Sequence, residues 1–144
     1  MDEAIEILLV EDNPGDVRLI IEVLKNCKIQ NKIEVVCDGE EALNYLHKKE
    51  KYQNNSTPDL ILLDLNLPKK DGREVLRDLK KDEHLKKIPV VILTSLTDKS
   101  AILESYNNHA NCFISKPVGL DEFENMVREI EKFWLETAKL PKNK

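Results

Sequence analysis

The chain is poor in the residues that mark several common classes of protein. Among its 144 residues it has only three cysteines, an odd number that lie far apart: Cys27, Cys37 and Cys112. Cysteines this sparse form no disulfide framework, so we expect reduced thiols and a cytoplasmic protein. The chain also has only three histidines, and their spacing is not that of metal ligands: His47, His84 and His109.

Two further absences concern membranes and nucleic acids. No apolar run approaches the roughly 18 residues of a membrane span, and the opening MDEAIEILLV carries acids where a signal peptide would be basic. The formal net charge is -5, with no basic stripe. We therefore expect no membrane and no nucleic acid as partners, because sequence-independent binding to phosphates requires many lysines and arginines.

Short apolar runs alternate with amphipathic stretches along the chain. The runs at 5–10, 32–37, 59–64, 88–94 and 111–115 predict strands, and several are apolar nearly throughout, as is typical of parallel strands covered on both faces. The stretches between them have apolar residues at helical spacing. This order predicts an α/β fold of the (βα)5 type. Right-handed crossovers favour a doubly wound five-stranded parallel sheet in the flavodoxin-like order 2-1-3-4-5.

The ten predicted elements occupy residues 1–140 as a single domain. They leave 141–144 as a short polar tail and no room for an output domain. The polar segment 47–59 is predicted to be a surface excursion. Capping signals that predict helix starts are Asn13 before Pro14, Asp38, Thr97 or Asp98, and Asp121.

Polar side chains follow the predicted strands at their carboxyl ends, where sheets of this kind hold their ligands. Asp64 has the most unusual surroundings, because it follows four apolar residues and precedes Leu65. Taking an unpaired carboxylate out of water is costly, so such a group usually has a partner or a function. Five residues are therefore predicted to meet at one edge of the sheet: Glu11, Asp12, Asp64, Thr94 and Lys116.

The charges of this group indicate what it needs. Two carboxylates about 4 Å apart repel each other by roughly 4 kcal/mol at an effective dielectric constant near 20. Lys116 offsets part of the repulsion between Glu11, Asp12 and Asp64. A divalent cation would offset the rest, and an all-oxygen site prefers a hard ion such as Mg²⁺. Carboxylate-bound Mg²⁺ is typical of phosphoryl transfer.

Four stretches in this order, LLVEDNPGD, LILLDLNLPKKDG, VVILTS and FISKP, resemble the CheY-like receiver domains of two-component response regulators. The resemblance covers essentially the whole chain. The opening VEDNPGDVRLI, the long polar loop after the second helix and the lack of an output domain are most similar to small stand-alone receivers associated with phytochrome-type sensor histidine kinases.

The resemblance implies a single-domain response regulator of a phosphorelay, in which Asp64 accepts a phosphoryl group from a phosphohistidine of a sensor histidine kinase. It implies direct Mg²⁺ ligands in Asp12, Asp64 and the backbone carbonyl of Asn66, with Glu11 acting through a bound water. It also implies that the protein is not an enzyme with a separate substrate, because it catalyses only its own phosphorylation and dephosphorylation.

The remaining roles that the resemblance implies concern the switch. Lys116 would pair with the phosphoryl oxygens, and Thr94 would turn its hydroxyl onto them. Phe113 stands at the position of the switch aromatic, and Pro117 would follow a cis peptide. Movement of Thr94 would empty space into which Phe113 rotates, so that signalling is a population shift between two packings.

The surface of the fourth helix, fifth strand and fifth helix is the family's usual output face. The apolar residues Met126 and Phe133 widen the stripe of the last helix and suggest homodimerisation there, although a wide core stripe explains them as well.

Three alternatives remain open. An aspartyl-phosphate phosphatase would need a second acid two residues after Asp64, where this chain has Asn66. A flavodoxin-like carrier is disfavoured by the acidic loop EDNPGD, which would repel a flavin phosphate. A pseudo-receiver, an interaction module that is never phosphorylated, would lack a use for the five site residues.

Overall fold

The structure is a computed structural model that describes residues 4–96 and 98–141. Within these ranges the elements are β1 (Ile5–Val10), α1 (Pro14–Lys25), β2 (Asn31–Val36), α2 (Gly39–Leu46), the 3-10 helix η1 (Glu50–Tyr52), β3 (Leu60–Leu63), α3 (Gly72–Lys81), β4 (Val90–Thr94), α4 (Lys99–Asn107), β5 (Cys112–Ser115), α5 (Leu120–Ile130) and the π-helix η2 (Glu131–Thr137). All strand pairs are parallel, in the order β2-β1-β3-β4-β5. The predicted fold is confirmed, with strand ends shifted by one or two residues.

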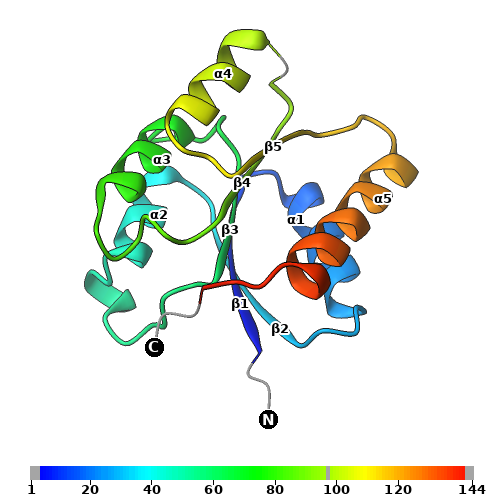
Figure 1. Cartoon of the computed structure of the whole chain (residues 1–144), viewed down its shortest axis with the longest axis horizontal. Helices are drawn as coiled ribbons and strands as arrows, with labels where there is room; N and C mark the ends of the chain where they lie inside the picture. Colours follow the sequence, from blue (N-terminus) through cyan, green and yellow to red (C-terminus); the bar gives the residue numbers. More distant parts are fainter. Residues whose placement is uncertain (1–3, 97, 142–144) are drawn as a thin grey trace.

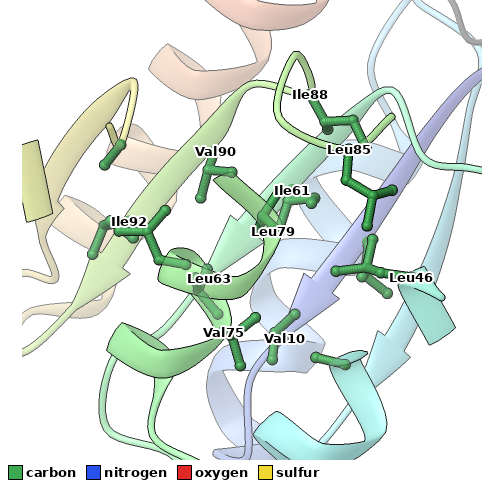
Figure 2. Close-up of a cluster of buried hydrophobic side chains, with 14 of the residues drawn as sticks. Val10, Leu46, Ile61, Leu63, Val75, Leu79, Leu85, Ile88, Val90 and Ile92 are labelled. Carbon is green, nitrogen blue, oxygen red and sulfur yellow. The ribbon is translucent and has the colours of Figure 1, made fainter. Parts of the chain in front are cut away.

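Helices cover both faces of the sheet, with α2, α3 and α4 on one side and α1 and α5 on the other (Figure 1). Successive residues of a strand point to opposite faces, so β3 sends Ile61 and Leu63 toward α3 and sends Leu60 and Leu62 toward α1 and α5. Figure 2 shows the first of these two cores, where Leu79 of α3 packs over β3. β3, at the centre of the sheet, is apolar and buried throughout because helices cover both of its faces.

Most of the predicted helix starts are confirmed. Asn13 accepts hydrogen bonds from the backbone of the first turn of α1, Asp38 does so for α2, and Asp98 does so for α4. The prediction for the last helix is wrong, because α5 begins at Leu120, and Asp121 is already inside its first turn. Thr97, the other residue considered for the fourth helix, lies outside the described residues.

One glycine sets how closely α3 approaches the segment that follows β3. A Cβ atom at Gly72 would meet the carbonyl oxygen of Asp64 and would lie 2.6 Å from the Cα atom of Leu65. The Gly72 amide instead donates a hydrogen bond of 2.9 Å to the carbonyl of Leu65. The start of α3 therefore supports the backbone that carries Asp64.

The last helix continues past α5 as η2, and its two surplus apolar residues have different environments. Met126 is buried against the sheet, while the side chain of Phe133 is 54% exposed and packs edge-to-face on Trp134. Of these two residues, only Phe133 is therefore exposed enough to contact a partner. The predicted polar tail at 141–144 lies outside the described residues except for its first residue.

Two other features bear on the expectations from composition. No helix in the described part of the chain is long and apolar enough to cross a membrane. The three cysteines are all free thiols, as predicted, and Cys37 lies exposed just after β2. The predicted surface excursion at 47–59 contains η1, whose Tyr52 packs on Tyr45 and donates a hydrogen bond to Glu41.

Candidate functional site

The carboxyl ends of β1, β3 and β5 bring a lysine and two acids into direct contact. Val10 and Leu63 are partners in the sheet register, so the next residue of each strand, Glu11 and Asp64, leaves the sheet at the same level. Lys116 reaches both acids from β5, with its Nζ atom 2.6 Å from Glu11 Oε1 and 2.9 Å from Asp64 Oδ2. The predicted meeting of these three residues is confirmed by their geometry.

These charges lie almost entirely out of water. Glu11 is 1% exposed, Asp64 is 5% exposed, and the side chain of Lys116 is 7% exposed. Buried charges persist only when they are paired and hydrogen-bonded. The second oxygen of Glu11 accepts from the backbone amide of Asn13, and Asp64 Oδ1 accepts from the amide of Asn66 at 3.0 Å. The site is therefore prearranged by backbone as well as by side chains.

A third carboxylate, which the sequence analysis missed, completes the environment of the lysine. Asp16 Oδ2 lies 2.9 Å from Lys116 Nζ. Asp16 belongs to the first turn of α1, which begins at the same edge of the sheet, three residues after the cap Asn13. That position was the available signal, since a first-turn side chain lies close to the strand end that precedes its helix.

Burial and neighbouring charges shift the pKa values of Glu11 and Lys116. Burial raises the pKa of Glu11 from 4.5 to about 7, and the charge of Asp64 adds to the rise, while the hydrogen bond from Lys116 opposes it. For Lys116, burial lowers the pKa, but the hydrogen bonds to Glu11, Asp16 and Asp64 outweigh it and leave the pKa above its ordinary value. The lysine therefore stays charged, and without a cation the site carries excess negative charge.

The acids also form a group that suits a divalent cation. Glu11, Asp12 and Asp64 each offer one carboxylate oxygen, and these oxygens lie within 4.8 Å of one another. Three oxygen donors fit a hard cation, and the exposed Asp12 leaves one side of the group open to solvent, where waters could complete the coordination. The backbone carbonyl of Asn66 remains a predicted fourth ligand.

The two predicted switch residues lie on β4 and β5, two of the strands that lead to the site. Thr94 is fully buried at the end of β4, and its hydroxyl accepts a hydrogen bond of 3.4 Å from the Leu96 amide. Phe113 on β5 is half-buried against the core on the α3 side, and its backbone amide donates to the hydroxyl of Tyr106 at 3.1 Å.

The predicted cis peptide before Pro117 is not present. The described residues contain no cis peptide bond. A trans bond before proline is favoured by about 0.5–1 kcal/mol unless the surroundings select the cis form. Here Lys116 already contacts its three acids through a trans linkage, so nothing in this state of the site requires the less favourable isomer.

The comparison with family models identifies this architecture. Residues 7–128 match the response regulator receiver domain. The chain belongs to the response regulator receiver family. It is 48% identical over 135 residues to response regulator Rcp1 of Synechocystis sp. (strain ATCC 27184 / PCC 6803 / Kazusa), a match that covers 94% of this chain and 92% of that protein.

Two solved structures are also similar to this receiver. One is the phosphorylated cyanobacterial phytochrome response regulator RcpA, with a TM-score of 0.95 and 50% identity, covering 97% of this chain and 100% of that one. The other is the Mn²⁺-bound form of Rcp1, with a TM-score of 0.94 and 47% identity, covering 95% and 99%. The receiver is thus a response regulator of a two-component system, and it is similar to the cyanobacterial phytochrome response regulator RcpA.

Proposed function

We propose that this receiver accepts a phosphoryl group on Asp64 from a phytochrome-type sensor histidine kinase, in a Mg²⁺-dependent reaction in the cytoplasm. The observation that carries the proposal is the position of Asp64, buried beside the Lys116 ammonium and grouped with Glu11 and Asp12. The relatives support it, since one is described as a phosphorylated phytochrome response regulator and another as an Mn²⁺-bound form.

The transfer needs a nucleophile and stabilisation of charge. A carboxylate oxygen of Asp64 attacks phosphorus and forms the P–O bond, while the P–N bond of the phosphohistidine breaks and the imidazole leaves with the electron pair and takes up a proton. Lys116 stabilises the charge on the equatorial phosphoryl oxygens. Asp12, Asp64 and the carbonyl of Asn66 would hold Mg²⁺ directly, with Glu11 acting through a bound water, and the ion would supply further charge neutralisation when bound.

The signal would be read from the same group of residues. An acyl phosphate on Asp64 adds negative charge and strong acceptor oxygens. The Thr94 hydroxyl, which now accepts from the Leu96 amide, can instead donate to the phosphoryl group. When the Thr94 side chain turns toward the phosphoryl group, it leaves space into which the Phe113 side chain can rotate. One phosphoryl group would therefore shift the equilibrium between two packing arrangements of these side chains. The protein acts on no separate substrate.

The output would be contact with another protein, and homodimerisation through the α4–β5–α5 face is part of the proposal. Exposed apolar side chains of α4 are Leu103 and Tyr106, which are 63% and 47% exposed, and Phe133 of η2, which follows α5, is 54% exposed. Sedimentation velocity with and without phosphorylation tests this. An unchanged monomer in both states removes the dimer from the proposal.

Incubation with acetyl phosphate and MgCl₂, followed by intact-mass spectrometry, tests the acceptor. We expect a mass gain of one phosphoryl group in the wild type and none in Asp64→Asn or in the presence of EDTA. Asp59→Asn is the matched control, because Asp59 is also a buried acid, at the opposite end of β3, and should leave the gain intact once circular dichroism shows a folded chain. A gain that persists in Asp64→Asn refutes the assignment, and no gain in the wild type indicates a pseudo-receiver.

A further inference from the structure

One carboxylate beside Lys116 has no part in the function proposed above. Asp16 Oδ2 lies as close to the ammonium as Asp64 Oδ2 does, at 2.9 Å. Yet Asp16 is absent from the group of described residues whose oxygens could share a cation, which consists of Glu11, Asp12 and Asp64. Its side chain is 22% exposed, which is more than either of the other two acids that contact the ammonium. The role of Asp16 therefore has to be sought in what it does to Lys116.

The start of α1 fixes Asp16 firmly. The Asn13 side chain accepts hydrogen bonds from the amides of Gly15 and Asp16, at 3.0 and 3.1 Å, and Pro14 restricts the first helical position. A negative charge in the first turn of a helix is favoured by the helix dipole. The cap therefore holds the backbone of Asp16 in place without help from a cation.

The number of hydrogen bonds that Lys116 can donate indicates when its contact with Asp16 becomes important. An ammonium has three N–H donors, and Lys116 gives one each to Glu11, Asp16 and Asp64. A cation bound by Glu11 and Asp64 would compete for their oxygens and repel the ammonium. A phosphoryl group on Asp64 would move the negative charge from that carboxylate to the phosphoryl oxygens, so the Lys116 contact at Asp64 would have to rearrange. Only the Asp16 contact is independent of both events.

We propose that Asp16 is a positioning residue, which keeps the Lys116 ammonium beside Asp64 when a cation or a phosphoryl group occupies the site. The inference rests on the proposed function for its purpose, but the positioning itself is a property of the metal-free protein. It makes the first turn of α1 a structural part of the acceptor site. Asp16 acts through Lys116 and touches neither the cation nor the phosphoryl group.

The first test observes the ammonium directly in metal-free protein. We expect the wild type to show a slowly exchanging Lys116 ammonium resonance in a ¹⁵N–¹H spectrum, Asp16→Asn to lose it, and Asp16→Glu to restore it in part. Glu74→Gln is the matched control, since Glu74 is an exposed acid in the first turn of α3, and it should leave the resonance unchanged. A resonance that survives in Asp16→Asn overturns the proposal.

The second test measures Mg²⁺ affinity by calorimetry in a double-mutant cycle. Loss of a charged hydrogen bond predicts that Asp16→Asn weakens Mg²⁺ binding roughly five- to tenfold in the wild type, but less than about twofold in Lys116→Met. Equal weakening in both backgrounds would mean that Asp16 acts only as a remote charge, and would overturn the proposal. A wild type that binds no Mg²⁺ removes the cation from the proposed function, and the ammonium resonance then decides on Asp16 alone.

Discussion

Replacing Lys116 with methionine removes the charge that three acids share while keeping a side chain of similar length. In the metal-free protein this leaves Glu11, Asp16 and Asp64 without the ammonium that now lies 2.6–2.9 Å from each of them. We expect a large loss of stability, a tighter Mg²⁺ site and a much slower gain of the phosphoryl group. The loss of stability can be estimated from the burial of the acids.

Removing one partner of a buried ion pair typically costs about 3–5 kcal/mol, because the other charge stays buried without compensation. Glu11 and Asp64 are 1% and 5% exposed, so neither can regain water without opening the fold. Asp16 is more exposed and contributes less. We therefore expect Lys116→Met to lower the free energy of unfolding by about 3–5 kcal/mol in EDTA above pH 7.

The sign of the pH dependence follows from Glu11. Burial raises its pKa from 4.5 to about 7, so between these values the folded chain binds more protons than the unfolded chain, and stability falls as the pH rises. Without Lys116, which opposes the rise, the pKa of Glu11 moves higher still. The window then extends above pH 7, and the deficit of Lys116→Met relative to the wild type should grow with pH.

Urea unfolding in EDTA and in MgCl₂, repeated across this pH range, measures the loss of stability, its pH dependence and the gain in stability from Mg²⁺, while intact-mass spectrometry follows the gain of the phosphoryl group. Mg²⁺ at about 100 times its dissociation constant stabilises a folded protein by about 2.7 kcal/mol, and the variant should gain more than the wild type at equal concentration. Lys87→Met is the charge-matched control, because Lys87 is exposed, and it should change stability by less than about 0.5 kcal/mol. A deficit below about 1 kcal/mol in EDTA, or one independent of pH, refutes this reasoning.

Three other substitutions test neighbouring features. In Gly72→Ala, a gain in helix propensity of up to about 1 kcal/mol opposes a clash with the Asp64 backbone. We expect the clash to dominate, so urea unfolding should show that the free energy of unfolding falls by about 1–3 kcal/mol. A net gain in stability would contradict the close approach of α3. Tyr106→Phe removes the acceptor for the Phe113 amide, so hydrogen exchange at that amide should accelerate while global stability falls by no more than about 1.5 kcal/mol; unchanged exchange would count against the contact. Leu96→Glu replaces the half-buried apolar side chain two residues after Thr94 with a polar one that can orient an attacking water, so it should shorten the lifetime of the phosphoryl group, as followed by intact mass. An equal lifetime would mean that Leu96 does not slow hydrolysis.

The site residues that follow the strands could be predicted, because the carboxyl ends of parallel strands all lie at one edge of the sheet. Once the apolar runs are recognised as strands, the residue after each run must lie at the carboxyl edge. The register that pairs Val10 with Leu63 then places Glu11 and Asp64 together, as the structure has them. The position of Lys116 near these acids could be predicted once β5 was placed in the same sheet, next to β4.

The contribution of α1 to the site could not be read in the same way. Asp16 looks like an ordinary first-turn acid, and Asp121 in α5 has the same kind of position. The difference is orientation, because only the first turn of α1 faces the Lys116 ammonium. Helical periodicity gives the direction of a side chain around its own axis but does not say which neighbour it meets.

The apolar surplus of the last helix shows a similar limit. Met126 and Phe133 both widen the apolar stripe, but the structure buries the first and exposes the second. The local geometry changes between them, since α5 ends at Ile130 and η2 winds more loosely through Phe133. A period fixed at the α-helical value cannot anticipate that change. The prediction of a cis bond before Pro117 was wrong for a different reason, because it was carried over from a family pattern, and the described residues contain no cis peptide bond.

The two buried acids of β3 show why burial alone does not identify a functional carboxylate. Asp59 and Asp64 flank the same strand and are 4% and 5% exposed. At the amino end, Asp59 Oδ2 accepts from the backbone amide of Glu6 at 2.9 Å, so this carboxylate ties β3 to β1. At the carboxyl end, Asp64 shares a lysine with two other acids, and a side-chain ammonium can exchange its acceptors whereas a backbone amide in a sheet cannot. The phosphoryl transfer that we propose therefore needs the buried acid whose partner can exchange its acceptors, and that acid is Asp64.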